Sequence, residues 1–179
     1  MQYYKELAEN IQDLLNAVVI RAAEDFREYS VKLLQNPEDE EAAREKEEVI
    51  AFFLSQDFKV YTTVSGKMIL TRLEAEEVQM AELFVEFREK KEAMMDCRKR
   101  FRAGKNSDQA LMAEAIRLAQ RIREIERIPE GVWKDLFELK TREKNALGEI
   151  SQWRRKYAKE EKYAECAACS ALSGAVSES

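Results

Sequence analysis

The chain has 179 residues, with 30 Lys and Arg, 35 Asp and Glu, no His and a formal net charge of −5. The absence of histidine excludes Ser-His-Asp triads and histidine-containing metal sites, and it removes the commonest general base near neutral pH. Five Gly and two Pro allow few turns, so the secondary-structure elements must be long. This composition predicts an all-α protein with no catalytic site, cofactor or metal.

The charges are separated along the chain. Residues 1–86 carry 9 Lys and Arg against 19 Asp and Glu, whereas residues 87–163 carry 21 against 14. Such asymmetry indicates electrostatic partners rather than catalysis. We expect an acidic helical bundle over residues 1–75, long basic helices forming a hairpin over 76–163, and a disordered tail over 164–179.

The first predicted helix has one apolar face, whose members recur every three or four residues: Leu7, Ile11, Leu14, Val18, Ala22, Phe26, Tyr29 and Leu33. Asn36-Pro37 ends this helix and is expected to open the next, with Asn36 as the N-cap and Pro37 in the first helical position. The second helix should end near Ser55. Residues 58–73 allow two interpretations, a short β-hairpin turning at Ser65-Gly66 or a short helix from Gln56 to Thr63 followed by a turn.

A long helix is expected from Lys67 to Arg102, with a stutter or exposure at Lys90 and Lys91. A heptad seam then runs through Leu111, Ala115, Leu118, Ile122 and Ile125, and a second one through Val132, Leu136, Leu139, Glu143, Ala146, Ile150, Trp153 and Tyr157. A short loop with Pro129 and Gly131 joins the two seams, which together predict a C-terminal antiparallel helical hairpin.

Several short features follow one another in a fixed order between residues 25 and 77: Phe26-Arg27, Asn36-Pro37, Phe52-Phe53 with Ser55, Phe58, Thr62 or Thr63, Gly66 and Ile69-Leu70. In this order the stretch resembles a group of uncharacterised small helical proteins from phages and prophages of Gram-positive bacteria. The resemblance implies a helical conformation through Phe52 to Ser55 and a phage or prophage origin. It implies no reaction.

Basic residues predict one partner-binding face: Arg98, Lys99, Arg100, Arg102, Lys105, Arg117 and Arg121. Such a face could contact phosphates of a nucleic acid. The alternative is a set of solvated helix faces held by pairs such as Arg121 with Glu124.

Acidic residues predict a second partner-binding face that could mimic a phosphate backbone: Glu38, Asp39, Glu40, Glu41, Glu45 and Glu48. The alternative is charge that favours the start of a helix and keeps the chain in solution.

Two other motifs are better explained by structure than by chemistry. Cys166-Ala-Ala-Cys169 has redox or half-zinc spacing, but the sequence offers neither the further ligands nor an α/β unit around it. The aromatic residues Trp133, Phe137 and Trp153 are expected to pack inside the fold.

We expect a non-catalytic interaction protein, encoded by a phage or prophage, that binds and sterically inhibits a host protein or ribonucleoprotein. An anti-CRISPR or other counter-defence inhibitor fits this description. The alternative is a nucleic-acid-binding accessory or regulatory protein that uses the basic hairpin. No apolar run is long enough for a membrane span, no signal peptide is recognisable, and the odd number of cysteines indicates the cytoplasm, here that of the bacterial host. The sequence does not indicate an oligomeric state.

Overall fold

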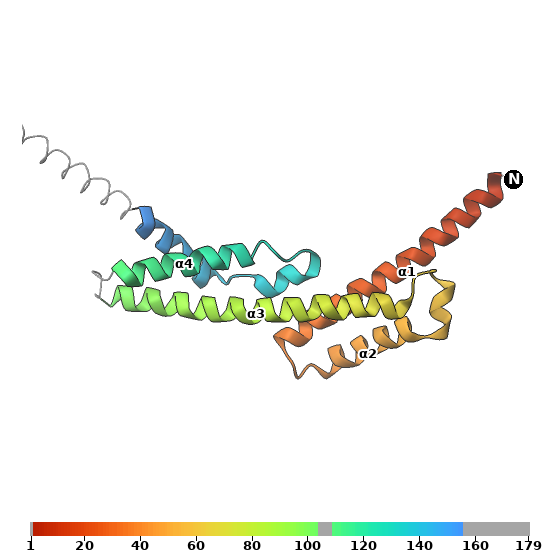
Figure 1. Cartoon of the computed structure of the whole chain (residues 1–179), viewed down its shortest axis with the longest axis horizontal. Helices are drawn as coiled ribbons and strands as arrows, with labels where there is room; N and C mark the ends of the chain where they lie inside the picture. The colour runs from red at the N-terminus through yellow and green to blue at the C-terminus, as the bar shows by residue number, and fades with distance from the viewer. Residues whose placement is uncertain (1, 104–108, 156–179) are drawn as a thin grey trace, which may run out of the picture. The chain divides into compact units, whose positions relative to one another are not determined.

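The computed structural model describes residues 2–103 and 109–155, and all regular structure in this part of the chain is helical. The elements follow one another as α1 (Gln2–Gln35), α2 (Glu40–Leu54), the 3₁₀-helix η1 (Gln56–Val60), α3 (Gly66–Arg102), α4 (Gln109–Ile125), the 3₁₀-helix η2 (Gly131–Phe137) and a last α-helix over residues 141–155 (Figure 1). The expected all-α class is therefore confirmed for the described residues.

The chain folds into two compact units. Unit 1 comprises Met1–Glu86 and Ile125–Glu138, and unit 2 comprises Phe87–Glu124 and Leu139–Ser179. The first part of α3 therefore belongs to unit 1 and its second part to unit 2.

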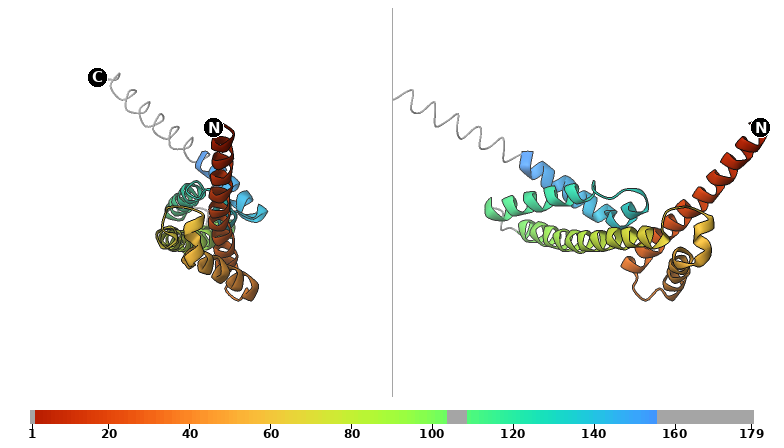
Figure 2. Two further views of the ribbon diagram at one scale, coloured as in Figure 1. Left: turned by 90° about the vertical axis from the view of Figure 1, so that its right-hand side faces the viewer. Right: turned by 45° about the vertical axis from the view of Figure 1, so that its right-hand side comes forward.

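The core of unit 1 is built from aromatic and aliphatic side chains of α1, α2, η1 and α3. Its buried members are Phe26, Phe53, Phe58, Leu70 and Leu73. α1 and α2 lie side by side (Figures 1 and 2). Burial of a Phe or Leu side chain contributes roughly 1.5–3 kcal/mol, so this cluster is a major source of stability for unit 1.

Two ion pairs link the helices of unit 1. Lys46 Nζ of α2 lies 2.6 Å from Glu77 Oε1 of α3 and 4.6 Å from the centre of the Phe26 ring. Arg27 of α1 donates from Nε and Nη2 to the two carboxylate oxygens of Glu76, each at 2.9 Å. A bidentate pair of this kind fixes orientation as well as distance, and it therefore sets the register of α1 against α3.

The segment after α2 does not form the β-hairpin considered for residues 58–73. Phe58 lies in η1, is buried, and has its ring centre 5.4 Å from that of Phe52. α3 begins at Gly66, where a Cβ atom would overlap with the backbone oxygen of Phe53. The aromatic contacts of η1 and the close approach at Gly66 favour the alternative, a short helix followed by a turn. A lone hairpin is only marginally stable in water.

The expected start of α2 at Asn36-Pro37 is wrong by three residues. Asp39 is the N-cap, because its Oδ1 accepts a hydrogen bond of 2.9 Å from the N–H of Ala42. Asn36 Oδ1 instead accepts a 3.4 Å hydrogen bond from the N–H of Glu38, which closes a turn around Pro37. Asp and Asn are equally good N-caps, so local preference alone does not choose between the two positions.

Unit 2 packs the second part of α3 with α4 and the helix over residues 141–155. Its buried apolar side chains are Phe87, Met94, Cys97, Leu111, Met112, Ala115, Leu118, Ala119, Ile122, Leu139, Ala146, Leu147 and Ile150. Phe101 stacks on Trp153 with ring centres 4.0 Å apart. Arg123 Nη2 donates to Ser151 Oγ at 2.6 Å and so links α4 to the last helix.

The last helix begins at residue 141, whereas the apolar spacing predicts a helix from Val132. Residues 131–137 form η2, which starts at Gly131 with a φ of +55°. η2 belongs to unit 1, Glu138 after it is extended, and Leu139 already belongs to unit 2. At this point the change from helical to extended backbone coincides with the passage of the chain from unit 1 to unit 2.

Glu143 interrupts the predicted seam because its side chain caps the first turn of the last helix. It is buried, and its Oε2 accepts a 2.8 Å hydrogen bond from the N–H of Lys140. Its Oε1 lies 3.4 Å from Lys91 Nζ. A Glu in the third position of a helix commonly caps its first turn in this way. Lys91, where a stutter or exposure is expected, is half-buried through this pair, and Lys90 is half-buried as well.

Candidate interaction surfaces

The predicted basic face is centred on the end of α3, within unit 2. Arg98 donates from Nε to Glu149 Oε2 at 2.7 Å, and Arg102 donates from Nε to Glu149 Oε1 at 2.9 Å. The Arg98 side chain is only 15% exposed, whereas that of Arg102 is 60% exposed. One carboxylate therefore neutralises half of the charge of this pair. Sequence reasoning missed Glu149, because it lies on a different helix far along the chain.

Glu149 is held in its ionised form. Burial raises its pKa, but the hydrogen bonds from Arg102 and Arg98 and the charges of these residues lower it more, so the pKa lies below its ordinary value. The carboxylate consequently remains an acceptor for both guanidinium groups at neutral pH.

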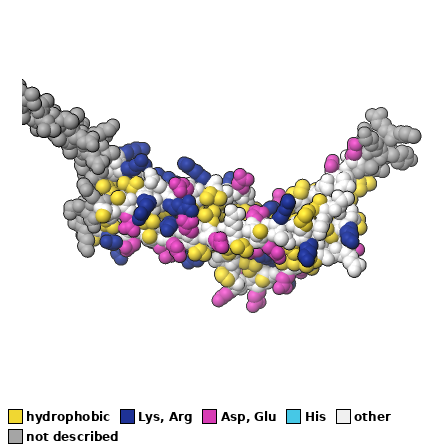
Figure 3. Space-filling view, viewed as in Figure 1, with side chains coloured by type: hydrophobic (Ala, Val, Ile, Leu, Met, Phe, Trp, Pro, Cys, Tyr) yellow, Lys and Arg dark blue, Asp and Glu magenta, His cyan; other side chains and the backbone are white. Residues whose placement is uncertain are grey.

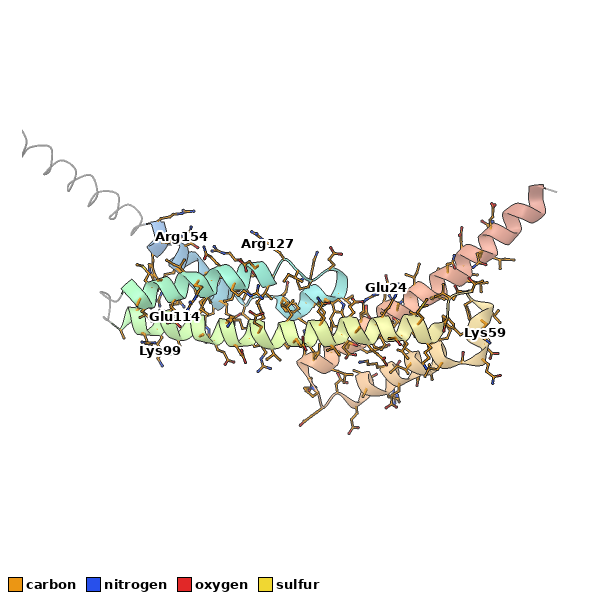
Figure 4. All side chains as sticks on the ribbon, viewed as in Figure 1. Glu24, Lys59, Lys99, Glu114, Arg127 and Arg154 are labelled. Carbon is orange, nitrogen blue, oxygen red and sulfur yellow. The ribbon has the colours of Figure 1, made fainter. Side chains whose placement is uncertain are left out.

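A hollow of about 440 Å³ opens beside this cluster and is lined by Met95, Asp96, Arg98, Lys99, Arg102 and Arg142. Lys99 is exposed on α3 (Figure 4), and Arg142 is exposed on the last helix. Arg142 is absent from the predicted basic face, because its contribution depends on how two helices pack. The hollow has four cations against Asp96 and the neighbouring Glu149, so its surroundings are moderately positive.

The other predicted basic residues do not line this hollow. Arg100 and Arg117 are not among its lining residues. Arg121 lies 3.3 Å from Glu124, as the alternative of solvated helix faces expects. Lys105 lies outside the described residues. Among the described members of the predicted set, Arg98, Lys99 and Arg102 are the ones that line this hollow.

The six predicted acidic residues take three different roles. Asp39 caps α2. Glu45 and Glu48 line a groove between α1 and α2. The remaining three are exposed: Glu38, Glu40 and Glu41.

The groove between α1 and α2 has a volume of about 530 Å³ and lies wholly within unit 1. Its lining residues are Ala17, Val18, Arg21, Ala22, Asp25, Tyr29, Glu45, Glu48, Val49 and Phe52. The apolar side chains of Val18, Val49 and Phe52 form much of this lining. A concave apolar surface with a few polar groups is the usual character of a binding site.

An apolar strip on α1 continues the groove towards the N-terminus. It consists of Ile11, Leu14 and Val18, whose side chains are 51%, 67% and 38% exposed. Their spacing of three and four residues places them on the face of α1 that also carries Ala22. Val19 and Ala22 are the first residues of α1 that pack on the core of unit 1. The apolar strip is therefore a helix face without a partner in the described part of the chain.

The rim of the groove is predominantly acidic. Arg21 is its one lining cation and lies 2.8 Å from Asp25, 3.6 Å from Glu24 and 3.9 Å from Glu28. On α2, Glu48 is exposed and forms no ion pair with another described residue. Figure 3 shows acidic side chains gathered over α2.

Tyr29 and Glu45 join the two walls of the groove. The Tyr29 hydroxyl donates to Glu45 Oε2 at 3.4 Å. Burial raises the pKa of the Tyr29 phenol, and the negative charges of Glu45 and Asp25 raise it further. The phenol therefore stays protonated and remains a donor.

A further cavity of about 620 Å³ in unit 1 is lined by Arg27, Glu76 and Trp133, together with Glu24. Trp133 Nε1 donates to Glu76 Oε1 at 2.5 Å. Burial raises the pKa of Glu76, but hydrogen bonds from Arg27 and Trp133 lower it to below its ordinary value. Through these hydrogen bonds the Glu76 carboxylate links α3 to α1 and to η2.

The remaining candidates give no chemical site within residues 2–103 and 109–155. Cys97 is buried, and the Cys166-Ala-Ala-Cys169 motif lies outside the described residues. Trp133 and Phe137 are buried, as the packing interpretation expects. No three His, Cys, Asp or Glu side chains of the described residues are grouped so that they could hold a metal ion. Among the described helices, none has the length and apolar character that crossing a membrane requires.

The chain was compared with protein-family models, with curated proteins and with solved structures, and no match was found in any of the three comparisons. Its function is therefore inferred from the surfaces described above.

Proposed function

We propose that this chain is a non-catalytic interaction protein that binds a protein partner through the apolar strip of α1 and the adjoining groove. The observation that supports this most is the strip itself, three large aliphatic side chains exposed in a row on one helix. Exposed apolar surface costs about 25 cal/mol per Å², and a partner that covers the strip removes this cost. Continuous exposed apolar patches of this kind commonly mark interaction sites.

The length of α1 supports the same proposal. α1 has 34 residues, but its contacts with the core of unit 1 begin only at Val19. Most of the stability of a helix in a protein comes from tertiary packing of its amphipathic face, and the residues before Val19 do not pack on this core. A partner that covers Ile11, Leu14 and Val18 would stabilise this half of the helix.

We further propose that the partner is a host protein or nucleoprotein in the bacterial cytoplasm, which the chain inhibits by occupying its surface. The resemblance of residues 25–77 to small phage proteins supports a phage or prophage origin, and an inhibitor of a host protein fits that origin. The lack of histidine, of a Gly-rich phosphate loop and of a nucleophile motif supports binding rather than turnover. An anti-CRISPR or other counter-defence inhibitor would act in this way.

The experiment is affinity capture from nuclease-treated bacterial lysate, followed by reconstitution with the purified captured protein. The bait is compared with Val18→Glu, which places a charge in the groove, and with Ile20→Glu. Ile20 is 60% exposed and lies on the opposite face of α1, so it is a matched control. We expect Val18→Glu to lose the partner and Ile20→Glu to keep it. Equal binding by all three baits would contradict the proposal.

A second function, binding of nucleic acid by the basic hairpin of α4 and the last helix with α3, is supported by the hollow beside Lys99 and Arg142. Exposed cations around a concave surface suit phosphate groups. The hydrogen bonds from Arg98 and Arg102 to Glu149 weigh against it, because they satisfy these guanidinium groups within the chain.

A further inference from the structure

The groove and the strip have the dimensions of one side of a helix. From Ile11 to Tyr29 the face of α1 extends over about 27 Å at 1.5 Å per residue, or five helical turns. The half near Tyr29 is bordered by Glu45, Glu48, Val49 and Phe52 of α2. Grooves of this form receive amphipathic helices, whose apolar residues enter at spacings of three and four.

The charges along the α1 and α2 edges of the groove indicate the charge of the partner helix. On the α2 side, Glu41, Glu45 and Glu48 follow at spacings of four and three and therefore form one row. On the α1 side, the single guanidinium of Arg21 is shared among three carboxylates, at distances between 2.8 and 3.9 Å. Arg44 pairs with Glu45 at 3.4 Å, but Glu41 and Glu48 lie in the same row, so both edges are net negative. Complementary charge across an interface favours correct encounter and disfavours partners of like charge.

From these observations we infer that the groove binds a cationic amphipathic helix of a partner protein, with Lys or Arg beside its apolar face. The inference rests on the proposed function, because it specifies the partner element for the same surface. A second copy of this chain is a poorer occupant, since two such grooves would bring their acidic edges together.

The test uses fluorescence anisotropy of the full chain with a labelled 18-residue peptide of defined sequence. The probe has Leu at positions spaced by three and four and Lys beside them. One control peptide has Glu at every Lys position, and a second is a scramble with the same composition. At 150 mM NaCl we expect the Lys peptide to bind about tenfold more tightly than either control, because both apolar register and charge must match.

Matched variants locate the binding. Val18→Glu is expected to weaken the Lys peptide about tenfold, and Ile20→Glu is expected to leave it within about twofold. Glu48→Lys is expected to weaken it about fivefold, whereas Glu47→Lys, with the same charge change on the other face of α2, should have little effect. Circular dichroism and urea unfolding of each variant verify that the fold is retained.

Four results would contradict the inference. Equal affinity for the Lys and Glu peptides, equal affinity for the scramble, or unchanged binding by Val18→Glu would overturn the inference. So would a dimer in sedimentation that Val18→Glu dissociates, because the occupant would then be a second copy. If Val18→Glu abolishes capture of the partner while all peptides bind alike, the proposed function stands and only the cationic helix is rejected.

Discussion

Arg98 on α3 donates a 2.7 Å hydrogen bond to Glu149 on the last helix, and its side chain is only 15% exposed. Arg98 belongs to the predicted basic face, and this pair gives it a structural role. A charged group at such depth needs its partner, because the cost of leaving it unpaired exceeds the net worth of the pair. The relationship leads to the first two predictions.

Glu149→Gln should destabilise unit 2 by about 1–3 kcal/mol, because Arg98 and Arg102 lose their shared carboxylate. The free energy of unfolding is measured by urea denaturation. Glu124→Gln is the control, since Glu124 is 63% exposed and pairs with Arg121 at the surface, where removal costs less than about 1 kcal/mol. Equal losses in both variants would contradict a structural role for Glu149.

The stability that Glu149 provides should depend on pH only in acid. The folded pKa of Glu149 is lowered from its ordinary value of 4.5, so the unfolded state binds more protons between the two values. The difference in unfolding free energy between the wild type and Glu149→Gln should therefore be constant from pH 7 to about 4.5. It should shrink as the pH falls further through the folded pKa. A difference that shrinks between pH 7 and 5 would show that another group is responsible.

Two glycine substitutions should have opposite signs. Gly66→Ala should destabilise the chain by about 1–3 kcal/mol, because the new methyl group overlaps with the backbone oxygen of Phe53. Gly148→Ala should stabilise it by about 0.5–1 kcal/mol, because Gly148 is helical and a methyl group added there would meet no atom within 4 Å. Thermal unfolding of both variants tests this pair. A neutral Gly66→Ala would mean that α3 can start elsewhere.

Binding to random duplex or single-stranded DNA should be weak at 150 mM salt. A protein that makes about six phosphate contacts loses on the order of a thousandfold in affinity between 50 and 200 mM salt. The net charge of −5 and the engagement of Arg98 and Arg102 by Glu149 oppose such contacts. Filter binding over a salt series measures the slope. Tight binding that Lys99→Glu with Arg142→Glu abolishes would instead favour the nucleic-acid function.

Helix positions could be predicted where the apolar residues of a segment all lie on one helix face. The helix expected from Lys67 to Arg102 agrees closely with α3, and the heptad spacing from Leu111 to Ile125 identifies α4. In both cases the apolar residues recur at the helical period. The same rule failed at Val132, because residues 131–137 form the 3₁₀-helix η2 and Glu138 after it is extended.

The groove between α1 and α2 and the apolar strip could be predicted only in part from the sequence. Glu45 and Glu48 were found from the acidic run, but that run does not show that they line a groove together with Val18. The spacing of Ile11, Leu14 and Val18 predicted one apolar helix face, but apolar periodicity does not distinguish a face covered by the same chain from an uncovered one. Exposure is a tertiary property, and here it separates the strip from the core.

Because Cys97 is buried, the reactivity of its thiol can be used as a probe for the opening of unit 2. Burial raises the pKa of this thiol, and the charge of Glu114 raises it further, so the reactive thiolate is scarce while the unit is closed. In a chain with Cys166→Ser and Cys169→Ser, a maleimide reagent would label Cys97 only during excursions from the native state. The labelling rate would then report how often these helices separate, residue-specifically and without denaturant.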